Sequence, residues 1–174
     1  EQAGRWSGWI EADGVRHELA AAYGNRDKSW GPRKWGGGGS RMWRWFSINF
    51  PDAGAHFGGI RIGTDAGDLH RGWVWRDGDH SSIREWKVTS TLADDGVTHL
   101  TTDVAATDKA GRTHDLHADV LRVAPHPNRF PDGSSSTVNE GLARWTYEGH
   151  TGWGISEYLH TFGPDGTIGK IGRA

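Results

Sequence analysis

Short runs in which apolar and polar residues alternate make up most of the chain. Two examples are MWRWFSINF (42–50) and RGWVWRDG (71–78). A period of two places successive side chains on opposite faces of a strand, and almost no segment has the helical period of 3.6. The pattern therefore predicts strands rather than helices.

Turn sequences such as ADG (12–14), DGDH (77–80) and DKAG (108–111) separate these runs. A meander of this length closes most naturally into a barrel, because closure leaves no unpaired edge strand. We predict an all-β fold, an antiparallel β-barrel of about eight to ten strands with little helix. The predicted strands are 4–12, 15–24, 42–50, 55–63, 71–78, 82–93, 97–108, 113–125, 142–149 and 151–162.

Two longer connections interrupt the pattern, GPRKWGGGGSR (31–41) and PHPNRFPDGSSS (125–136). We interpret the first as a natural mobile loop and the second as an exposed loop. Residues 136–141 could begin a short helical turn. Neither connection divides the chain into parts large enough for two cores, so we predict a single domain over 1–174.

Tryptophan is the informative residue in the composition. The chain has 174 residues with 11 Trp, 3 Tyr and 5 Phe, and only 34% of the residues are hydrophobic. The indoles must therefore supply much of the apolar burial. Either they fill a small core or several of them line an apolar cavity.

Charge and missing residue types exclude several classes of function. The net charge is −2, so no basic field indicates nucleic acid, and no apolar run is long enough for a membrane span. Cysteine is absent, which leaves the compartment open; our expectation is cytoplasmic. The chain opens EQAGRWSG without Met, which indicates a processed product or one piece of a longer protein.

Metal and cofactor motifs are also missing. His114 and His117 in HDLH would fall on opposite faces of a strand, and no HExxH motif or carboxylate cluster occurs. GGGGS lacks the Lys-Ser/Thr of a phosphate loop, and no G-x-S-x-G is present. We expect no metal and no cofactor.

The segment GNRDKSWGPRKW (24–35) places five charged side chains among indoles. Asp27 could donate a proton if an apolar pocket raised its pKa, or it could be a structural partner of an arginine. Glu157, alone on an apolar strand face, offers the same two alternatives. Arg44 alternates with Trp43 and Trp45, so either the indoles or the guanidinium faces inward.

RDKSWG (26–31), MWRWFS (42–47), VNEG followed by LARW (138–145) and GWGISEYLH (152–160) resemble one family. It is the lipocalin-like group that includes the carotenoid 1,2-hydratases (hydroxyneurosporene synthases). The resemblance implies a lipocalin-like barrel that is the second of two tandem domains. It also implies hydration, dehydration or cyclisation of a hydrophobic isoprenoid- or polyketide-like molecule. Lys28 stands where the family has a histidine, which puts an acid–base role there in doubt.

Two hypotheses follow. The first is a cofactor-independent lyase, hydratase or cyclase, and the second is a non-catalytic lipocalin-like module that binds a ligand or completes a partner domain or companion chain. For the first, the adjacency of first and last strands in a closed barrel predicts one buried polar group under aromatic cover. Its predicted catalytic residues are Arg26, Asp27, Arg44 and Glu157, and its predicted substrate-binding residues are Lys28, Trp30, Trp43, Trp45 and Trp73.

Overall fold

The structure is a computed structural model that describes residues 1–31 and 40–169. The chain divides into two compact units, residues 1–32 and 33–174, which are described separately below. Ten antiparallel strands and a single 3-10 turn, Pro51–Ala53, account for the regular structure of the described residues. The prediction of an all-β, antiparallel fold with little helix is confirmed.

The first unit is a β-hairpin of β1 (Gln2–Ala12) and β2 (Val15–Arg26). Alternation along β1, with the pairing of Ala12 and Val15, places Trp6, Ile10 and Val15 on one face. About half of the surface of each of these side chains is exposed. This face of the ribbon is therefore apolar and open.

The opposite face of the hairpin carries charge stacked on aromatic rings. The guanidinium of Arg5 lies 4.1 Å from the ring centre of Tyr23, and that of Arg16 lies 4.6 Å from the ring centre of Trp9. Arginine over an aromatic face is a favourable arrangement at an exposed site. The hairpin is thus an amphipathic ribbon.

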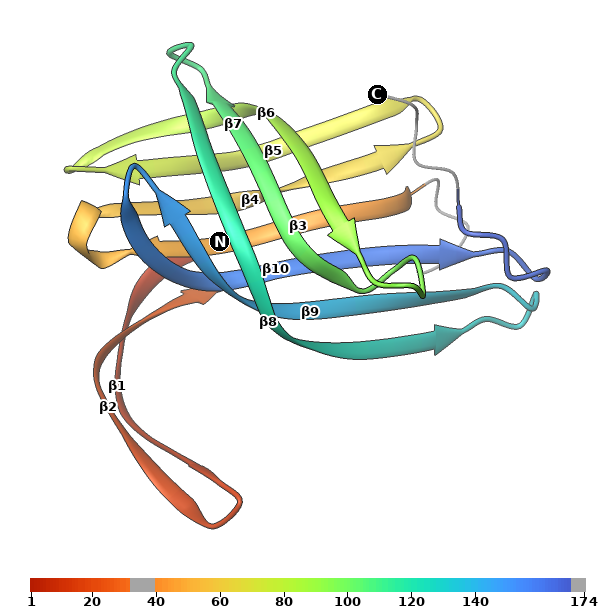
Figure 1. The fold of residues 1–174 in the computed structure, drawn as a ribbon, viewed down its shortest axis with the longest axis horizontal. Coiled ribbons are helices and arrows are strands. Elements are labelled where there is room, and N and C mark those ends of the chain that lie inside the picture. The colour runs from red at the N-terminus through yellow and green to blue at the C-terminus, as the bar shows by residue number, and fades with distance from the viewer. Residues whose placement is uncertain (32–39, 170–174) are drawn as a thin grey trace. The chain divides into compact units, whose positions relative to one another are not determined.

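The second unit is a closed barrel of eight strands in the order β10-β3-β4-β5-β6-β7-β8-β9 (Figure 1). In Figure 1, β6, β7 and β8 cross diagonally in front of β3, β4 and β10. The strands are β3 (Ser40–Phe50), β4 (Ala55–Thr64), β5 (Gly67–Arg76), β6 (Asp79–Leu92), β7 (His99–Asp108), β8 (Thr113–Arg129), β9 (Ser135–Tyr147) and β10 (His150–Phe162).

Two details of the prediction are wrong. Residues 136–141 are not a helical turn but part of β9, which pairs with β8 as far as Arg129 opposite Ser135. Buried and outward residues alternate from Asn139 to Tyr147, and β-branched Thr137 and Val138 before them suit an extended strand. The barrel closes between β10 and β3, not between β10 and the first strands of the chain.

Buried apolar and aromatic side chains, Phe46 and Trp86 among them, form the hydrophobic core of the barrel. The indole of Trp86 packs on the paired Gly59 and Gly72, where a Cβ would lie 2.7 and 2.8 Å from its Cζ2 atom. The indole N–H donates to the carbonyl of Arg71 at 2.9 Å. The two glycines are therefore needed for the backbone to approach this ring.

The predicted loop 31–41 falls mostly on residues 32–39, which lie outside the described residues. In the part of the chain that is described, no helix has the length and apolar character to cross a membrane.

Candidate functional site

The Arg44 side chain shows which face of β3 lines the barrel interior. Arg44 is 5% exposed and alternates with buried Met42 and Phe46, so it points into the interior. Trp43 and Trp45 consequently lie on the outer face. Of the two alternatives open from the sequence, the inward guanidinium is the one observed.

Inward polar residues form a continuous row across five neighbouring strands. Asn139 on β9 pairs with Tyr158 on β10, Tyr158 with Arg44 on β3, Arg44 with Arg61 on β4, and Arg61 with His70 on β5. Cross-strand partners on one face lie about 5 Å apart, so adjacent members of the row interact. We call these five residues the polar row.

Tyr158 has contacts on both faces of its ring. Its ring is stacked between the guanidinium of Arg44, 3.8 Å from the ring centre, and the imidazole of His99, 3.9 Å away at an angle of 9°. Its hydroxyl contacts the Thr102 hydroxyl at 3.0 Å and shares a hydrogen bond with Ser90. These contacts hold both the ring and the hydroxyl of Tyr158 in place.

The histidines beside Tyr158 are kept neutral. Burial lowers the pKa of His99 to about 4, and burial together with the cation of Arg44 lowers that of His160 to about 4. The Nε2 of His99 lies 2.8 Å from the carbonyl oxygen of Ser156, which can only accept, so Nε2 carries the proton. The buried Nδ1 of His99 and Nε2 of His160 have no hydrogen-bond partner.

Arg44 is a buried cation. Its Nη1 donates to the carbonyls of Trp43 at 2.8 Å and Leu159 at 3.2 Å. Burial, reinforced by the cation of Arg61, lowers the pKa of Arg44 to about 10, although the Tyr158 hydroxyl acts in the opposite direction. The guanidinium therefore stays charged at neutral pH, at a cost in solvation.

At the other end of the row, Arg61 is paired with a carboxylate and His70 lies close to two. The Nη2 and Nε of Arg61 lie 2.6 and 2.7 Å from Oδ2 of Asp68. The backbone N–H of Trp86 donates to Nδ1 of His70 at 3.0 Å. Burial and the nearby Arg61 lower the pKa of His70, while Asp68 and Glu85 act to raise it. The neutral ring therefore carries its proton on Nε2, which can donate to a ligand.

A cavity of about 790 Å³ lies against these residues. Arg61, Asp68 and His70 form its polar side, and its apolar side includes inward-facing residues of β6, β7 and β8. It also reaches residues with outward side chains, such as Lys87 and His117, so it opens through the wall. β5 and β6 pair only between Trp73–Arg76 and Asp79–Ser82, which leaves the wall open beyond Ser82. The inward-facing apolar residues of the lining are Trp86, Val88, Val104 and Leu116.

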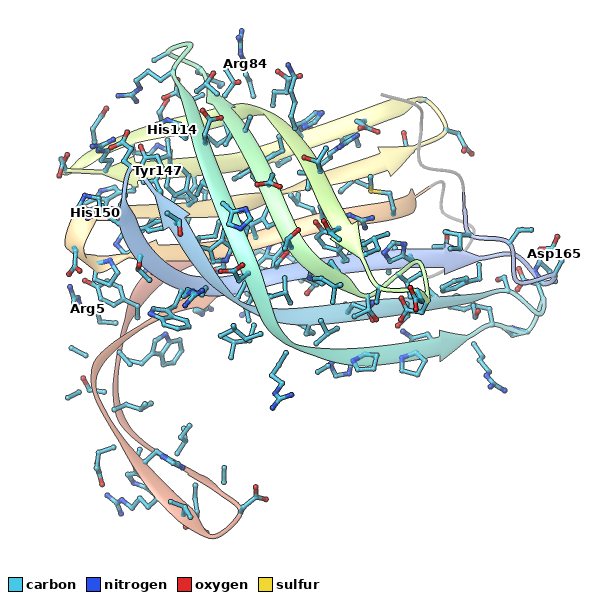
Figure 2. All side chains as sticks on the ribbon, in the orientation of Figure 1. Arg5, Arg84, His114, Tyr147, His150 and Asp165 are labelled. Carbon is cyan, nitrogen blue, oxygen red and sulfur yellow. The ribbon has the colours of Figure 1, made fainter. Side chains whose placement is uncertain are left out.

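A second polar network occupies the opposite end of the interior, where Figure 2 labels His114 and Tyr147. The hydroxyl of Tyr147 lies 2.7 Å from Nη1 of Arg76 and 2.9 Å from Nδ1 of His114. Burial raises the pKa of the Asp108 carboxyl, but hydrogen bonds from Arg112 outweigh this and lower it to about 2. A smaller cavity of about 360 Å³ adjoins this network. Most of these groups are paired with one another, although the buried Nε2 of His114 has no hydrogen-bond partner and lies 3.6 Å from Oδ2 of Asp108.

The predicted site residues of the barrel do not all meet. Arg44 belongs to the interior polar row, whereas Glu157 lies on the outer face and accepts a hydrogen bond from the indole N–H of Trp43 at 2.5 Å. Trp45 pairs with Glu157 on that face, and Trp73 lies outside against Gly58. A substrate-binding role for Trp43, Trp45 and Trp73 stays a prediction, but they do not line the interior cavity.

The remaining predicted residues belong to the first unit. Arg26 ends β2, and Lys28 lies 5.7 Å from the ring centre of Trp30, which is 83% exposed. Asp27 is exposed. The two units are described separately, so the predicted grouping of Arg26 and Asp27 with Arg44 and Glu157 stays a prediction.

The sequence interpretation missed Arg61, Asp68, His70 and His99. A signal was available for Arg61, which is the single charge in the apolar strand AHFGGIRIG (55–63). The separation of His114, buried, from His117, exposed, was predicted correctly. Among the described residues no group of three or more His, Cys, Asp or Glu is arranged to hold a metal ion.

The barrel thus combines an interior row of polar side chains with an adjoining cavity that has a polar and an apolar side. Residues 1–161 match the family described as domain of unknown function DUF7064, and the chain belongs to that family. No curated protein matches the sequence.

Among solved structures, kievitone hydratase from Nectria haematococca is similar in fold, with a TM-score of 0.61 and 13% sequence identity. The match covers 88% of this chain and 49% of that protein, so this chain spans about half of its length. At this identity the likeness shows the fold alone. It supports a barrel related in fold to a hydratase and does not assign the chain to the carotenoid hydratase family.

Proposed function

We propose that this chain is the barrel domain of a cofactor-independent lyase of the hydratase type. Its substrate would be a hydrophobic small molecule, isoprenoid- or polyketide-like, with an oxygen substituent beside a double bond. The observation that carries this proposal is the cavity with Arg61 and His70 on one side and apolar residues on the other. The fold likeness to a hydratase agrees with this reaction class.

The side chains at the cavity suffice for addition of water. Arg61 and the Nε2–H of His70 would donate to the substrate oxygen and polarise the conjugated double bond. A carboxylate, Asp68 or Glu85, would accept a proton from water while the water oxygen bonds to carbon. The same proton then passes to the neighbouring carbon, so one water is added overall and the reverse sequence removes it.

The test uses purified protein and a panel of unsaturated and hydroxylated isoprenoid and polyketide-like compounds, with mass spectrometry to detect gain or loss of one water. We expect turnover that His70→Gln lowers by at least about tenfold, as expected for loss of a positioned donor. The exposed His126→Gln is the matched control and should behave like the wild type. Equal turnover in both variants would reject the assigned role of His70.

A non-catalytic binding barrel is the second candidate. The observation that favours it is that Asp68 already accepts from Arg61 at 2.6 Å and Tyr158 is fixed by its neighbours. Groups that are engaged in internal contacts are less available for proton transfer. Saturable binding of panel compounds without gain or loss of water would support this candidate.

We also propose that the natural partner of the barrel is a second β-barrel domain, in the same protein or a companion chain. Two observations support it: the chain spans 49% of its structural neighbour, and the hairpin has an open apolar face with Trp6, Ile10 and Val15. An isolated two-stranded hairpin is marginally stable in water. A covering domain would stabilise it.

Hydrogen exchange tests the partner. Amides of β1 and β2 should exchange slowly in the full natural protein and fast in the 174-residue chain. Val15→Asp on the apolar face should remove that protection, whereas Arg16→Asp on the other face should not. Fast exchange in the full protein would contradict the proposal.

A further inference from the structure

The charge around Arg44 is not balanced. The guanidinium is 5% exposed, and its hydrogen bonds go from Nη1 to two backbone carbonyls. No carboxylate lies within ion-pair distance of it among the described residues. Among the described residues, the Tyr158 hydroxyl acts to raise the pKa of Arg44 and the cation of Arg61 acts to lower it. Burying a cation without a counter-ion is costly, so an anion at this position would be strongly favoured.

Arg61 extends this positive region to the cavity. It is the cross-strand partner of Arg44 on β4 and lines the cavity of about 790 Å³. Asp68 pairs with Arg61 through Oδ2, and among the described residues no ion pair joins a carboxylate to Arg44.

The neighbouring histidines are neutral and add no further positive charge. His99 and His160 are buried and neutral, with pKa values of about 4. Their unpartnered ring nitrogens, Nδ1 of His99 and Nε2 of His160, lie in the same polar end of the interior. The site therefore contains a surplus cation and unmatched polar atoms, which are the features of a place built for a charged polar group.

We infer that the small molecule taken by this barrel is an acid, and that its carboxylate, or another oxyanion, binds at the polar row with Arg44 and Arg61 as donors. This inference rests on the proposed function, because it names the ligand class of the same cavity. The apolar side of the cavity, with Trp86 and Leu116, would hold the hydrocarbon or aromatic body of the molecule.

The experiment compares two probes of equal shape, naphthalene carboxylate (naphthoate) and the neutral naphthalene carboxamide (naphthamide), by isothermal titration calorimetry at neutral pH. A charge-assisted hydrogen bond contributes about 1.5–3 kcal/mol, so the wild type should bind naphthoate at least about tenfold more tightly. Arg44→Met should lose this preference and keep its affinity for naphthamide. Arg44→Lys should retain part of the preference, because lysine keeps a cation at this position. This second variant keeps the inference testable if Arg44→Met does not fold.

The exposed Arg84, labelled in Figure 2, provides the matched control. Arg84→Met changes the net charge equally and should keep the preference. Equal affinity of the wild type for both probes would overturn the inference and leave interior binding in place. Loss of the preference in Arg84→Met would also overturn it, since net charge would then be the cause. Failure of the wild type to bind either probe would overturn the proposed interior site and this inference together.

Discussion

Acid should destabilise the barrel in a pH range set by its two innermost histidines. His99 and His160 are 0% and 2% exposed, and each has a pKa of about 4, compared with 6.5 for an unperturbed histidine. Between these values the unfolded chain binds protons that the folded chain does not. Stability therefore falls as the pH is lowered from 6.5 towards 4, and it is fully present above 6.5.

The size of the effect follows from the shift. One pKa unit corresponds to about 1.4 kcal/mol, so each histidine contributes about 3 kcal/mol and the pair about 6 kcal/mol to the loss. That is comparable with the whole stability of a typical domain, about 5–15 kcal/mol. His70 and His114, whose pKa values are also lowered by burial, act in the same direction.

Asp108 and His117 also make the stability depend on pH, but they can be distinguished from the two buried histidines. The pKa of Asp108 is lowered to about 2. Its contribution to the free energy of unfolding is therefore lost only as the pH falls from about 4 to about 2. The pKa of His117 is raised, chiefly by its hydrogen bond to Asp103. Its contribution is present at low pH and is lost as the pH rises through the raised pKa, so it has the opposite sign.

The assay is urea unfolding followed by tryptophan fluorescence at a series of pH values from 7.5 to 4, with the free energy of unfolding plotted against pH. His99→Gln and His160→Gln should each remove part of the slope, and the double variant most of it. His117→Gln is the control and should leave the slope in place. A free energy that does not change between pH 6.5 and 4, or a slope that is as steep in the double variant as in the wild type, would refute the reasoning.

Two further predictions concern packing. Tyr158→Phe removes a buried hydroxyl that bonds to Ser90, and should lower the free energy of unfolding by about 1–3 kcal/mol in urea titrations; an unchanged value would contradict the contacts described. Gly59→Ala places a methyl group 2.4 Å from the carbonyl oxygen of Arg71 and should lower the melting temperature sharply, whereas Gly4→Ala, with nothing within 4 Å, should not. Equal melting temperatures for the two alanine variants would contradict the close approach at Gly59.

The existence of the ten strands could be predicted because a period of two and tight turns are local properties of the sequence. The face of each strand could not. In MWRWF, bulky residues occupy both faces, so the pattern allowed either the indoles or Arg44 to point inward, and only closure with β10 decides between them. The separate sheet of β1 and β2 was not foreseeable either, because these strands are as apolar as those of the barrel.

The polar row shows why the site was harder to predict than the fold. Each member, such as Arg61 or His70, is a lone polar residue in its own strand, and the sequence offers many such residues. They become a site only through register, which aligns them across five strands. Register depends on bulges, such as that between Val120 and Arg122, which no periodicity marks.

The closure of the barrel by β3 and β10 sets the order of events during synthesis. Trp43 on β3 and Glu157 on β10 are 114 positions apart. At about 5–20 residues per second, the ribosome takes on the order of ten seconds to deliver the second strand after the first. Throughout that interval the edge of β3 offers unpaired backbone groups to any other chain. The nascent protein therefore passes through an aggregation-prone stage that ends only when β10 has left the ribosome.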